Sequence, residues 1–337
     1  MKGFVFRTLF SIMLIGAGLG ALLVWDFRHF FATALPVKEK QLVMVEPGAS
    51  FSQVARRMAA NGVLRWPHHA EYLSLRARLT GKADRLQVGE YSVEPGMTAA
   101  DLLGKLISGD SVQHKLTLIE GWNFHQMIRV LDKHSALDHK LESLDAEAVM
   151  KALGKPGEHP EGRFFPDTYS FTRGMSDIQV LQRAYQQMEK VLQDEWGLRA
   201  EGLPYKTPYE ALIMASIVEK ETGVARERAE IAGVFVRRLQ KGMLLQTDPT
   251  VIYGIGPGFD GNIRLRDLKR DTPYNTYTRA GLPPTPICMP GREAIHAALH
   301  PADGKTLYFV SKGDGSHQFS ETLEQHNAAV RKYQLKR

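Results

Sequence analysis

A glutamate on a nearly apolar helix is the residue best placed to do chemistry in this sequence. Residues 207–222 read TPYEALIMASIVEKET, with a threonine N-cap, a proline suited to the first helical position and Glu210 to complete a capping box. The residues between these ends are so uniformly apolar that the helix should be buried in a large core. Glu219 lies near the C-terminal end, on a face that it shares with Leu212 and Ala215.

This position predicts a general acid. A carboxyl group on an apolar face, close to the negative end of the helix dipole, should resist ionising, and its pKa should rise above the free value of about 4.3. A carboxyl group that stays protonated near neutral pH can protonate a glycosidic oxygen, which glycosidases do with an acid of pKa about 6. The alternative is a solvent-exposed glutamate at a frayed helix end, beside Lys220 and Glu221.

Composition and charge narrow the remaining functions. The chain is 43% hydrophobic and 24% charged, which indicates a globular protein, and its formal charge of +6 suits an acidic partner. Because no Arg/Lys-rich run is interleaved with aromatic residues, we expect no nucleic-acid binding. The single cysteine, Cys288, excludes a disulfide framework and a cysteine zinc cluster, and the histidines lack metal-ligand spacing. We therefore expect no metal, and without a Walker-type phosphate loop we expect no nucleotide cofactor.

An apolar run near the N-terminus predicts a membrane anchor. Residues 8–25 carry no charge, and as a helix they would span about 27 Å, close to the bilayer core of about 30 Å. Lys2 and Arg7 precede this run, which predicts a cytoplasmic tail at residues 1–7 and a periplasmic location beyond the inner membrane for the rest of the chain. A cleaved signal peptide is the alternative, with a loose small-residue site at residues 17–21.

The residues after the anchor predict a linker and then a small α+β module. Residues 26–40 form the charged linker, and the module occupies residues 41–115. A strand-like run, a tight Glu-Pro-Gly turn and a capped helix occur twice in it, and a looser third copy begins at residue 116. The first copy resembles the glycan-binding LysM fold, and the alternative is a packing or spacer module. Capping-box pairs support the three helix starts: Ser50 with Gln53, Thr98 with Asp101, and Asn123 with Gln126.

Aromatic residues at the end of the anchor should form an interfacial belt, namely Trp25, Phe27, Phe30 and Phe31.

Residues 116–337 make up a larger, mixed α/β domain around the glutamate helix. A polar turn at residues 246–250 leads into a strand-like run at residues 251–254, and a second polar loop at residues 274–284 is braced by prolines. Polar side chains on rigid loops are well suited to hold a substrate in register. The candidates for this positioning role are Gln246, Thr247, Asn275 and Tyr277.

Three stretches together resemble the YceG-like family of MltG-type endolytic murein transglycosylases. They are ASIVEKET around Glu219, LQTDPTVIYG at residues 245–254, and YNTY followed by GLPP at residues 274–284. The resemblance extends over the whole chain, including the single anchor, the LysM-like module and FFPDTYSF at residues 164–171. One loop departs from the pattern, because Cys288 and Met289 stand where small or polar residues are expected.

The resemblance implies a catalytic acid at Glu219 and cleavage of the β-1,4 bond between N-acetylmuramic acid and N-acetylglucosamine in nascent peptidoglycan strands. It also implies 1,6-anhydro-muramoyl ends, termination of strand elongation, no cofactor, and peptidoglycan synthases as candidate partners. One acid is sufficient, because the 6-hydroxyl of the sugar is the nucleophile and the same carboxyl group can donate and then accept a proton. Asp248 is the first candidate for a supporting role. Glu221 is the second candidate, and it ranks below Asp248 because its two-residue offset turns its side chain away from the face of Glu219.

Two other functions stay open from the sequence. A muramidase would use water activated by a second carboxylate, such as Asp248, and its products would carry reducing ends. A non-catalytic glycan-binding scaffold would bind strands without shortening them.

Overall fold

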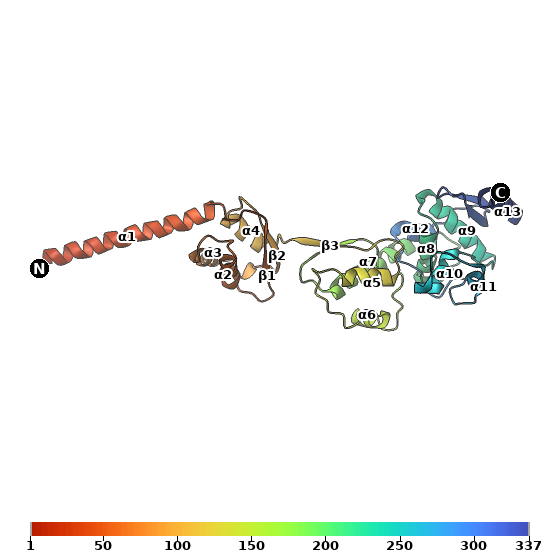
Figure 1. The fold of residues 1–337 in the computed structure, drawn as a ribbon, viewed down its shortest axis with the longest axis horizontal. Coiled ribbons are helices and arrows are strands. Elements are labelled where there is room, and N and C mark those ends of the chain that lie inside the picture. Colours follow the sequence, from red (N-terminus) through yellow and green to blue (C-terminus); the bar gives the residue numbers. More distant parts are fainter. Residues whose placement is uncertain (1, 336–337) are drawn as a thin grey trace. The chain divides into compact units, whose positions relative to one another are not determined.

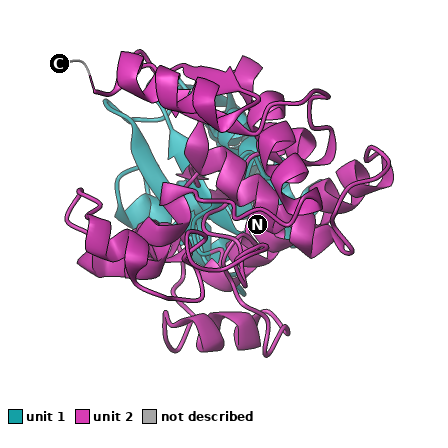
Figure 2. Cartoon of the chain, turned by 90° about the vertical axis from the view of Figure 1, so that its right-hand side faces the viewer, with its two compact units in different colours: residues 1–114, 172–174 teal, residues 115–171, 175–337 magenta. Residues whose placement is uncertain are grey.

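The computed structural model describes the backbone of residues 2–335 and the side chains of residues 6–335. Most of the predicted cytoplasmic tail, residues 1–7, therefore lies outside the described side chains. The described chain is a mixed α+β protein with two compact units (Figure 2). The first unit comprises Met1–His114 with Thr172–Gly174, and the second comprises Lys115–Phe171 with Met175–Arg337.

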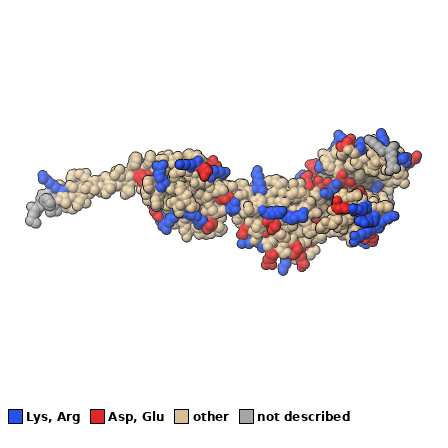
Figure 3. Space-filling view, in the orientation of Figure 1, with Lys and Arg blue, Asp and Glu red and all other residues tan. Residues whose placement is uncertain are grey.

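The first unit begins with one long apolar helix, α1 (Lys2–Ala32). Its segment Phe6–Ala32 is long and apolar enough to cross a membrane, judged by length and composition. No charged side chain lies between Arg7 and Asp26, and Figure 3 shows this stretch of the helix without acidic or basic groups. The helix is longer than the predicted span of residues 8–25.

The last turn of α1 belongs to the core of the first unit. Phe30 and Phe31 are only 6% and 4% exposed, and the Leu35 amide donates to the Met97 carbonyl at 2.8 Å. Two expectations are corrected by these contacts. Phe30 and Phe31 are core residues and not part of an interfacial belt, and Leu35 and Val37 of the predicted linker, residues 26–40, also lie in this core. The apolar side chains of this segment find a protein core to bury them, which stabilises the packed arrangement.

The first unit places a two-stranded sheet against three helices. β1 pairs antiparallel with β2, with Gln41 opposite Val93 and Val45 opposite Gly89. Its elements are β1 (Gln41–Val45), α2 (Phe51–Ala60), α3 (His68–Leu79), the 3₁₀ helix η1 (Ala83–Arg85), β2 (Gly89–Val93) and α4 (Ala99–Ser108). The predicted capping boxes at Ser50 and Thr98 are both present. The chain leaves this unit along β3 (Gln113–Thr117).

The second unit has two apolar clusters. The first gathers around α5 (Phe124–Asp132), α6 (Ala146–Ala152), β4 (Thr168–Thr172), which pairs with β3, and α7 (Asp177–Gly197). The capping box predicted at Asn123 is present at the start of α5. The second cluster gathers around α8 (Pro208–Glu221), α9 (Arg228–Gln240), α12 (Arg292–Leu299) and the hairpin of β5 (Tyr308–Ser311) and β6 (His317–Ser320). The remaining elements are η2 (Ala225–Glu227), α10 (Asp248–Ile255), η3 (Gly256–Gly258), α11 (Leu265–Lys269) and α13 (Leu323–Tyr333).

Helix α8 is buried on nearly all sides, as its composition predicts. It contacts α7, α9, α10 and α12, and Figure 1 shows it among these helices. Thr207 caps its first turn by accepting from the Glu210 amide, and Pro208 takes the first helical position. The expected capping box is incomplete, because the Glu210 carboxylate accepts from the Lys206 amide instead, at 2.5 Å.

The strand expected at residues 251–254 is wrong, because these residues lie within α10. The β-branched pair Val251 and Ile252 suggested a strand. Asp248 and Pro249 in the first turn instead favour a helix, since an acidic residue suits the helix dipole and proline suits an early helical position. α10 also contacts α8, and Val251 is buried.

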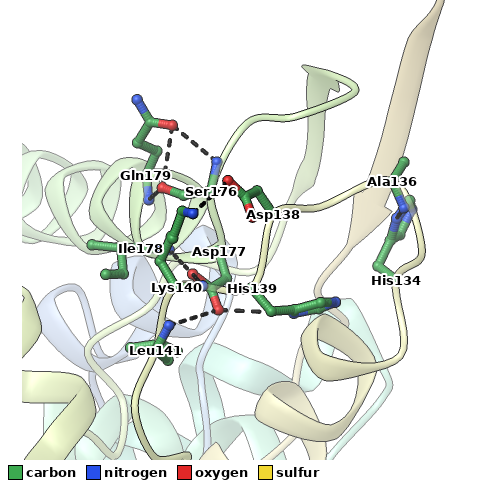
Figure 4. A network of polar contacts seen from close by, with 10 residues as sticks. All are labelled: His134, Ala136, Asp138, His139, Lys140, Leu141, Ser176, Asp177, Ile178 and Gln179. Atoms are coloured by element: carbon green, nitrogen blue, oxygen red, sulfur yellow. Dashed lines mark hydrogen bonds and ion pairs between the residues drawn. The ribbon is translucent and has the colours of Figure 1, made fainter. Parts of the chain in front are cut away.

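Asp177, a buried aspartate at the start of α7, holds residues 138–141 against that helix (Figure 4). Asp177 is 1% exposed, and its carboxylate accepts from the amides of Lys140 at 3.0 Å, Leu141 at 3.3 Å and Ile178 at 2.8 Å. The Asp177 amide in turn donates to the Asp138 carbonyl at 3.1 Å. This carboxylate therefore holds two chain segments together.

Asp177→Ala should lower the free energy of unfolding by roughly 1–3 kcal/mol, because it leaves the Lys140 and Leu141 amides unpaired. Hydrogen exchange at those two amides should also become faster. Asp138→Ala is the matched control, since the Asp138 carboxylate makes only a half-exposed ion pair with Lys140 at 3.1 Å and should matter by less than about 1 kcal/mol. Equal losses in the two variants would contradict this role for Asp177.

Candidate active site

The two glutamates near the end of α8 point to different parts of the second unit. Glu219 and Glu221 are two residues apart, which separates their side chains by roughly 200° around the helix. The structure agrees with this offset, because the two carboxyl groups have no hydrogen-bond partner in common. Each therefore has to be judged by its own surroundings.

The Glu219 carboxylate is engaged by the protein itself. Its Oε2 accepts from the Gly291 amide at 3.0 Å, and Gly291 is the N-cap of α12. Burial raises the pKa of Glu219, and the charge of Glu120 raises it further, against the lowering effect of the Gly291 hydrogen bond. The expected direction of the pKa shift is thus found, but the carboxylate is placed to fasten α8 to the start of α12.

The surroundings of Glu219 are closely packed. Main-chain hydrogen bonds join Gly121 to Met289 at 2.9 Å and Met289 to Trp122 at 2.8 Å. The Glu120 carboxylate lies so close to Gly291 that a Cβ atom at Gly291 would overlap it. These contacts pack the chain closely around the start of α12, where the Glu219 carboxylate is bound.

The Glu221 carboxyl group lies at the edge of a pocket. Its Oε1 accepts a short hydrogen bond from the Thr247 hydroxyl. Burial raises the pKa of Glu221 to about 7, and the neighbouring charge of Asp248 raises it as well, although the Thr247 hydrogen bond acts in the opposite direction. A carboxyl group with this pKa is still protonated in about half of the molecules at neutral pH and can act as a general acid.

The Glu221 pocket, as we call it, has a volume of about 490 Å³, within the range of ligand-binding pockets. Three of the polar residues expected at the site also line it, namely Gln246, Asp248 and Tyr277. The Tyr277 hydroxyl donates to Asp248 Oδ1 at 2.5 Å. The structure therefore brings the expected supporting residues to Glu221, and Glu219 is not among the residues that line this pocket.

The turn beside this pocket has a strained backbone. Gln246 has φ = 52°, and it is the only non-glycine residue with positive φ among the described residues. Its amide donates to the Thr276 carbonyl at 3.1 Å, and the Thr247 amide donates to the Thr276 hydroxyl at 3.1 Å. Such strain is commonly found at functional sites, where the surrounding structure maintains it.

Two of the candidate residues have their side chains engaged inside the protein. Thr247 is buried and donates to Glu221. Asn275 is 1% exposed, and its amide group donates to the carbonyls of Asp267, Leu268 and Arg270. The Asn275 side chain is therefore engaged by its own loop, whereas the sequence predicts that it positions a substrate.

Sequence reasoning missed the residues that the C-terminal part of the chain adds to the Glu221 pocket. Tyr308 from β5 and His326 from α13 both line it. Arg238 also lines it, and its guanidinium group donates to the carbonyls of Leu244, Leu245 and Leu307. No spacing pattern in the sequence could have linked these positions, because they lie between 17 and 105 residues from Glu221.

A third buried carboxyl group belongs to Glu161. Burial raises its pKa to about 7, against hydrogen bonds from the Phe124 amide at 3.0 Å and the Tyr253 hydroxyl at 2.9 Å. Its carboxylate accepts hydrogen bonds from groups on α5 and α10, and Glu161 is not among the residues that line the Glu221 pocket. We therefore assign Glu161 a role in stabilising the fold.

Two clusters of carboxylate and imidazole groups in the described residues are close enough to hold a metal ion. They are Asp26 with His68 and His69 in the first unit, and Glu195 with His296 and His300 in the second. The Glu195 carboxylate already accepts from Arg292 and His296 at 2.8 Å each. Neither cluster shares a residue with the Glu221 pocket.

Comparison with known proteins identifies the class of this chain. The model of the YceG-like family matches residues 43–332, so the chain belongs to that family. A Bacillus subtilis (strain 168) protein named endolytic murein transglycosylase is 31% identical over 309 residues, which cover 86% of this chain and 84% of that protein. A Streptococcus pneumoniae serotype 2 (strain D39 / NCTC 7466) protein of the same name is 27% identical over 98% of this chain, which spans 65% of that relative's length.

A solved structure of a yceG-like protein from Listeria monocytogenes is also similar. It is 30% identical, and the match covers 87% of this chain and 99% of that chain with a TM-score of 0.54. The fold is thus shared with a solved member of the family.

Gly291→Ala tests the packing around Glu219. The added Cβ atom would meet the Glu120 carboxylate, the end of an exposed side chain that can move aside, so the free energy of unfolding should fall by no more than about 1 kcal/mol. Gly223→Ala is the control, because a Cβ atom there meets nothing within 4 Å and its φ is not positive. Chemical denaturation of both variants measures the difference. A loss of more than about 2 kcal/mol relative to the control would show instead that the Glu120 side chain is held in place.

Proposed function

We propose that this chain is an endolytic murein transglycosylase, a lyase that cleaves within peptidoglycan strands. Its membership of the YceG-like family and its relatives of that name, at 27–31% identity over most of the chain, support the activity. The bond cleaved is the β-1,4 bond between N-acetylmuramic acid and N-acetylglucosamine, and the product carries a 1,6-anhydro end. Cutting nascent strands in this way ends their elongation.

We assign the general acid to Glu221 rather than to Glu219, the residue that the sequence favoured. The observation that carries this assignment is the environment of Glu221. Its carboxyl group has a pKa of about 7 and opens onto a pocket that Asp248 and Tyr277 also line. Glu219 is hydrogen-bonded to the Gly291 amide and lines no part of that pocket.

The reaction needs one carboxyl group in two successive roles. Protonated Glu221 gives its proton to the glycosidic oxygen as the bond from C1 of the muramoyl residue breaks. The 6-hydroxyl of the same muramoyl residue then forms the new bond to C1. The Glu221 carboxylate accepts the proton of that hydroxyl and returns to its starting state. No water enters the product.

The neighbours of Glu221 support these steps. Asp248 carries a negative charge that would stabilise positive charge at C1 in the transition state. Tyr277 holds that carboxylate through its hydroxyl, and Thr247 orients the carboxyl group of Glu221. Gln246, at the exposed edge of the Glu221 pocket, positions the substrate.

We further propose how the chain is organised in the cell. The long apolar helix is a single-pass anchor in the inner membrane, with residues 1–7 in the cytoplasm and a catalytic domain, residues 116–337, in the periplasm. The run of apolar residues in α1 supports the anchor, and the basic residues before it support the orientation. The strand, turn and helix units of residues 41–115 support a LysM-like module that holds glycan strands, and peptidoglycan synthases are the candidate partners.

Glu221→Gln should reduce cleavage of uncrosslinked peptidoglycan strands by about 10²–10⁴-fold, because the amide cannot deliver a proton. Glu219→Gln is the matched variant on the same helix and should retain far more activity once its stability is accounted for. Rates and products are measured by mass analysis, and wild-type products should end in 1,6-anhydro groups. If Glu219→Gln lost far more activity than Glu221→Gln, the general acid would be Glu219. Reducing ends would instead identify a muramidase with Asp248 as its base.

The rate should also depend on pH in a defined direction. The acid must hold its proton, and burial raises the pKa of Glu221 to about 7. We therefore expect kcat/KM to fall above about pH 7, approaching a tenfold loss per pH unit. A rate that stays level up to about pH 9 would contradict an acid with this pKa.

A further inference from the structure

The first unit is packed directly against the end of its long apolar helix. Helix α1 runs unbroken to Ala32, and Phe30 and Phe31 from its last turn lie in the core of the unit. The Arg76 guanidinium group of α3 lies over the Phe31 ring, 4.4 Å from its centroid. Because α1 and the unit are joined in this way, a bilayer around the apolar part of α1 brings one side of the unit to the lipid surface.

Helix α3 lies beside the end of α1 (Figure 1) and runs in the same direction. At its start, His68 Nε2 lies 3.3 Å from Asp26 Oδ2, and the Tyr72 hydroxyl donates to the same oxygen at 3.0 Å. One turn later, Arg76 lies against Phe31. The start of α3 is therefore level with Asp26, the first charged residue after the apolar run, and the rest of α3 leads away from the membrane.

Two exposed residues directly before α3 lie at this level. Arg65 and Trp66 line a small pocket together with residues of α1 that include Asp26 and His29. This pocket holds only about 90 Å³, well below the roughly 300 Å³ of a typical ligand pocket, so its exposed rim is the surface available for contact. Trp66 is 55% exposed, and Trp25, which stacks on His29 with 4.9 Å between ring centroids, is 61% exposed. Two tryptophans and an arginine thus gather where the apolar run ends.

These residue types match the chemistry of the lipid headgroup layer. Tryptophan is enriched where a membrane meets water, because its ring is apolar and its N–H group is polar. An arginine at the same depth can donate to lipid phosphate groups while its carbon chain lies along apolar groups. The surface continues from the lipid-facing side of α1, which favours lipid over a protein as its partner.

We propose that Arg65 and Trp66 form a second membrane contact, in which Trp66 lies in the headgroup layer beside Trp25 and Arg65 binds lipid phosphate groups. This contact would hold the first unit against the bilayer. It would also supply the aromatic belt to which Phe30 and Phe31 do not contribute, because they are buried. The inference rests on the proposed membrane anchor, and it is independent of the reaction and of the residue that catalyses it.

The experiment measures tryptophan fluorescence of the full chain in vesicles of phosphatidylcholine and phosphatidylglycerol that carry a nitroxide quencher on the headgroup. Tryptophan-to-phenylalanine substitutions leave one tryptophan in each of three chains: Trp25, Trp66, or the one introduced by Leu79→Trp. Leu79 is the matched control position, because it is 73% exposed at the other end of α3. It lies roughly 20 Å along the helix from Trp66, and the headgroup layer is only about 5–8 Å thick.

Trp25 and Trp66 should each lose at least about half of their fluorescence, whereas the Leu79→Trp chain should lose less than about a tenth. Arg65→Glu should reduce the quenching of Trp66 by about half, because lipid phosphates repel the new carboxylate. Arg78→Glu, at an exposed position near the other end of α3, should leave it unchanged.

Quenching of Trp25 without quenching of Trp66 would overturn the inference and keep the anchor, and this surface would then be one for a protein partner. Equal quenching of Trp66 and the Leu79→Trp chain would also contradict it, because the unit would have no preferred side toward the bilayer. Unchanged quenching after Arg65→Glu would reject the phosphate contact. A Trp25 that is not quenched would reject the proposed anchor itself, and this inference with it.

Discussion

The reaction that we propose depends on keeping water away from one carboxyl group while leaving it reachable from a pocket. An ionised carboxylate is costly to bury, and a buried glutamate therefore holds its proton to a higher pH than it does in water. Glu221 reaches that condition at the end of α8, where burial is the main cause of its raised pKa and Asp248 adds to it. The apolar residues of α8 are what make the burial possible, because they anchor the helix among its four neighbours.

The same helix end carries a second glutamate in different surroundings. The Glu219 carboxylate accepts a hydrogen bond from the amide of Gly291, the N-cap of α12. The Gly121 amide donates to the carbonyl of Met289, which lies just before that N-cap. Both glutamates are shielded from water, and both have raised pKa values. They differ in their neighbours, because Glu221 lines the pocket formed with α9, α13 and the β5–β6 hairpin, whereas Glu219 binds the Gly291 amide.

Local patterns in the sequence predicted much of this arrangement. The apolar composition of α8, its capped start and three capping boxes elsewhere were all readable, because each rests on neighbouring residues. The polar residues of the turn at 246–250 lie beside Glu221, and Val251 and Ile252 suggested a strand where a helix forms. The choice between Glu219 and Glu221 was not readable. It depends on Gly291, Thr247 and His326, which tertiary packing brings to the two faces of α8 from distant parts of the chain.

The most direct test of this account is the titration of Glu221 itself. The chain can be labelled with ¹³C at glutamate side-chain carboxyl carbons, and the Glu221→Gln variant identifies the signal by its loss. We expect that signal to titrate near pH 7, well above the ordinary glutamate value of about 4.3. A Glu221 signal that titrates near 4.3 would contradict the central claim, because the residue would then be ionised at neutral pH and unable to act as the acid.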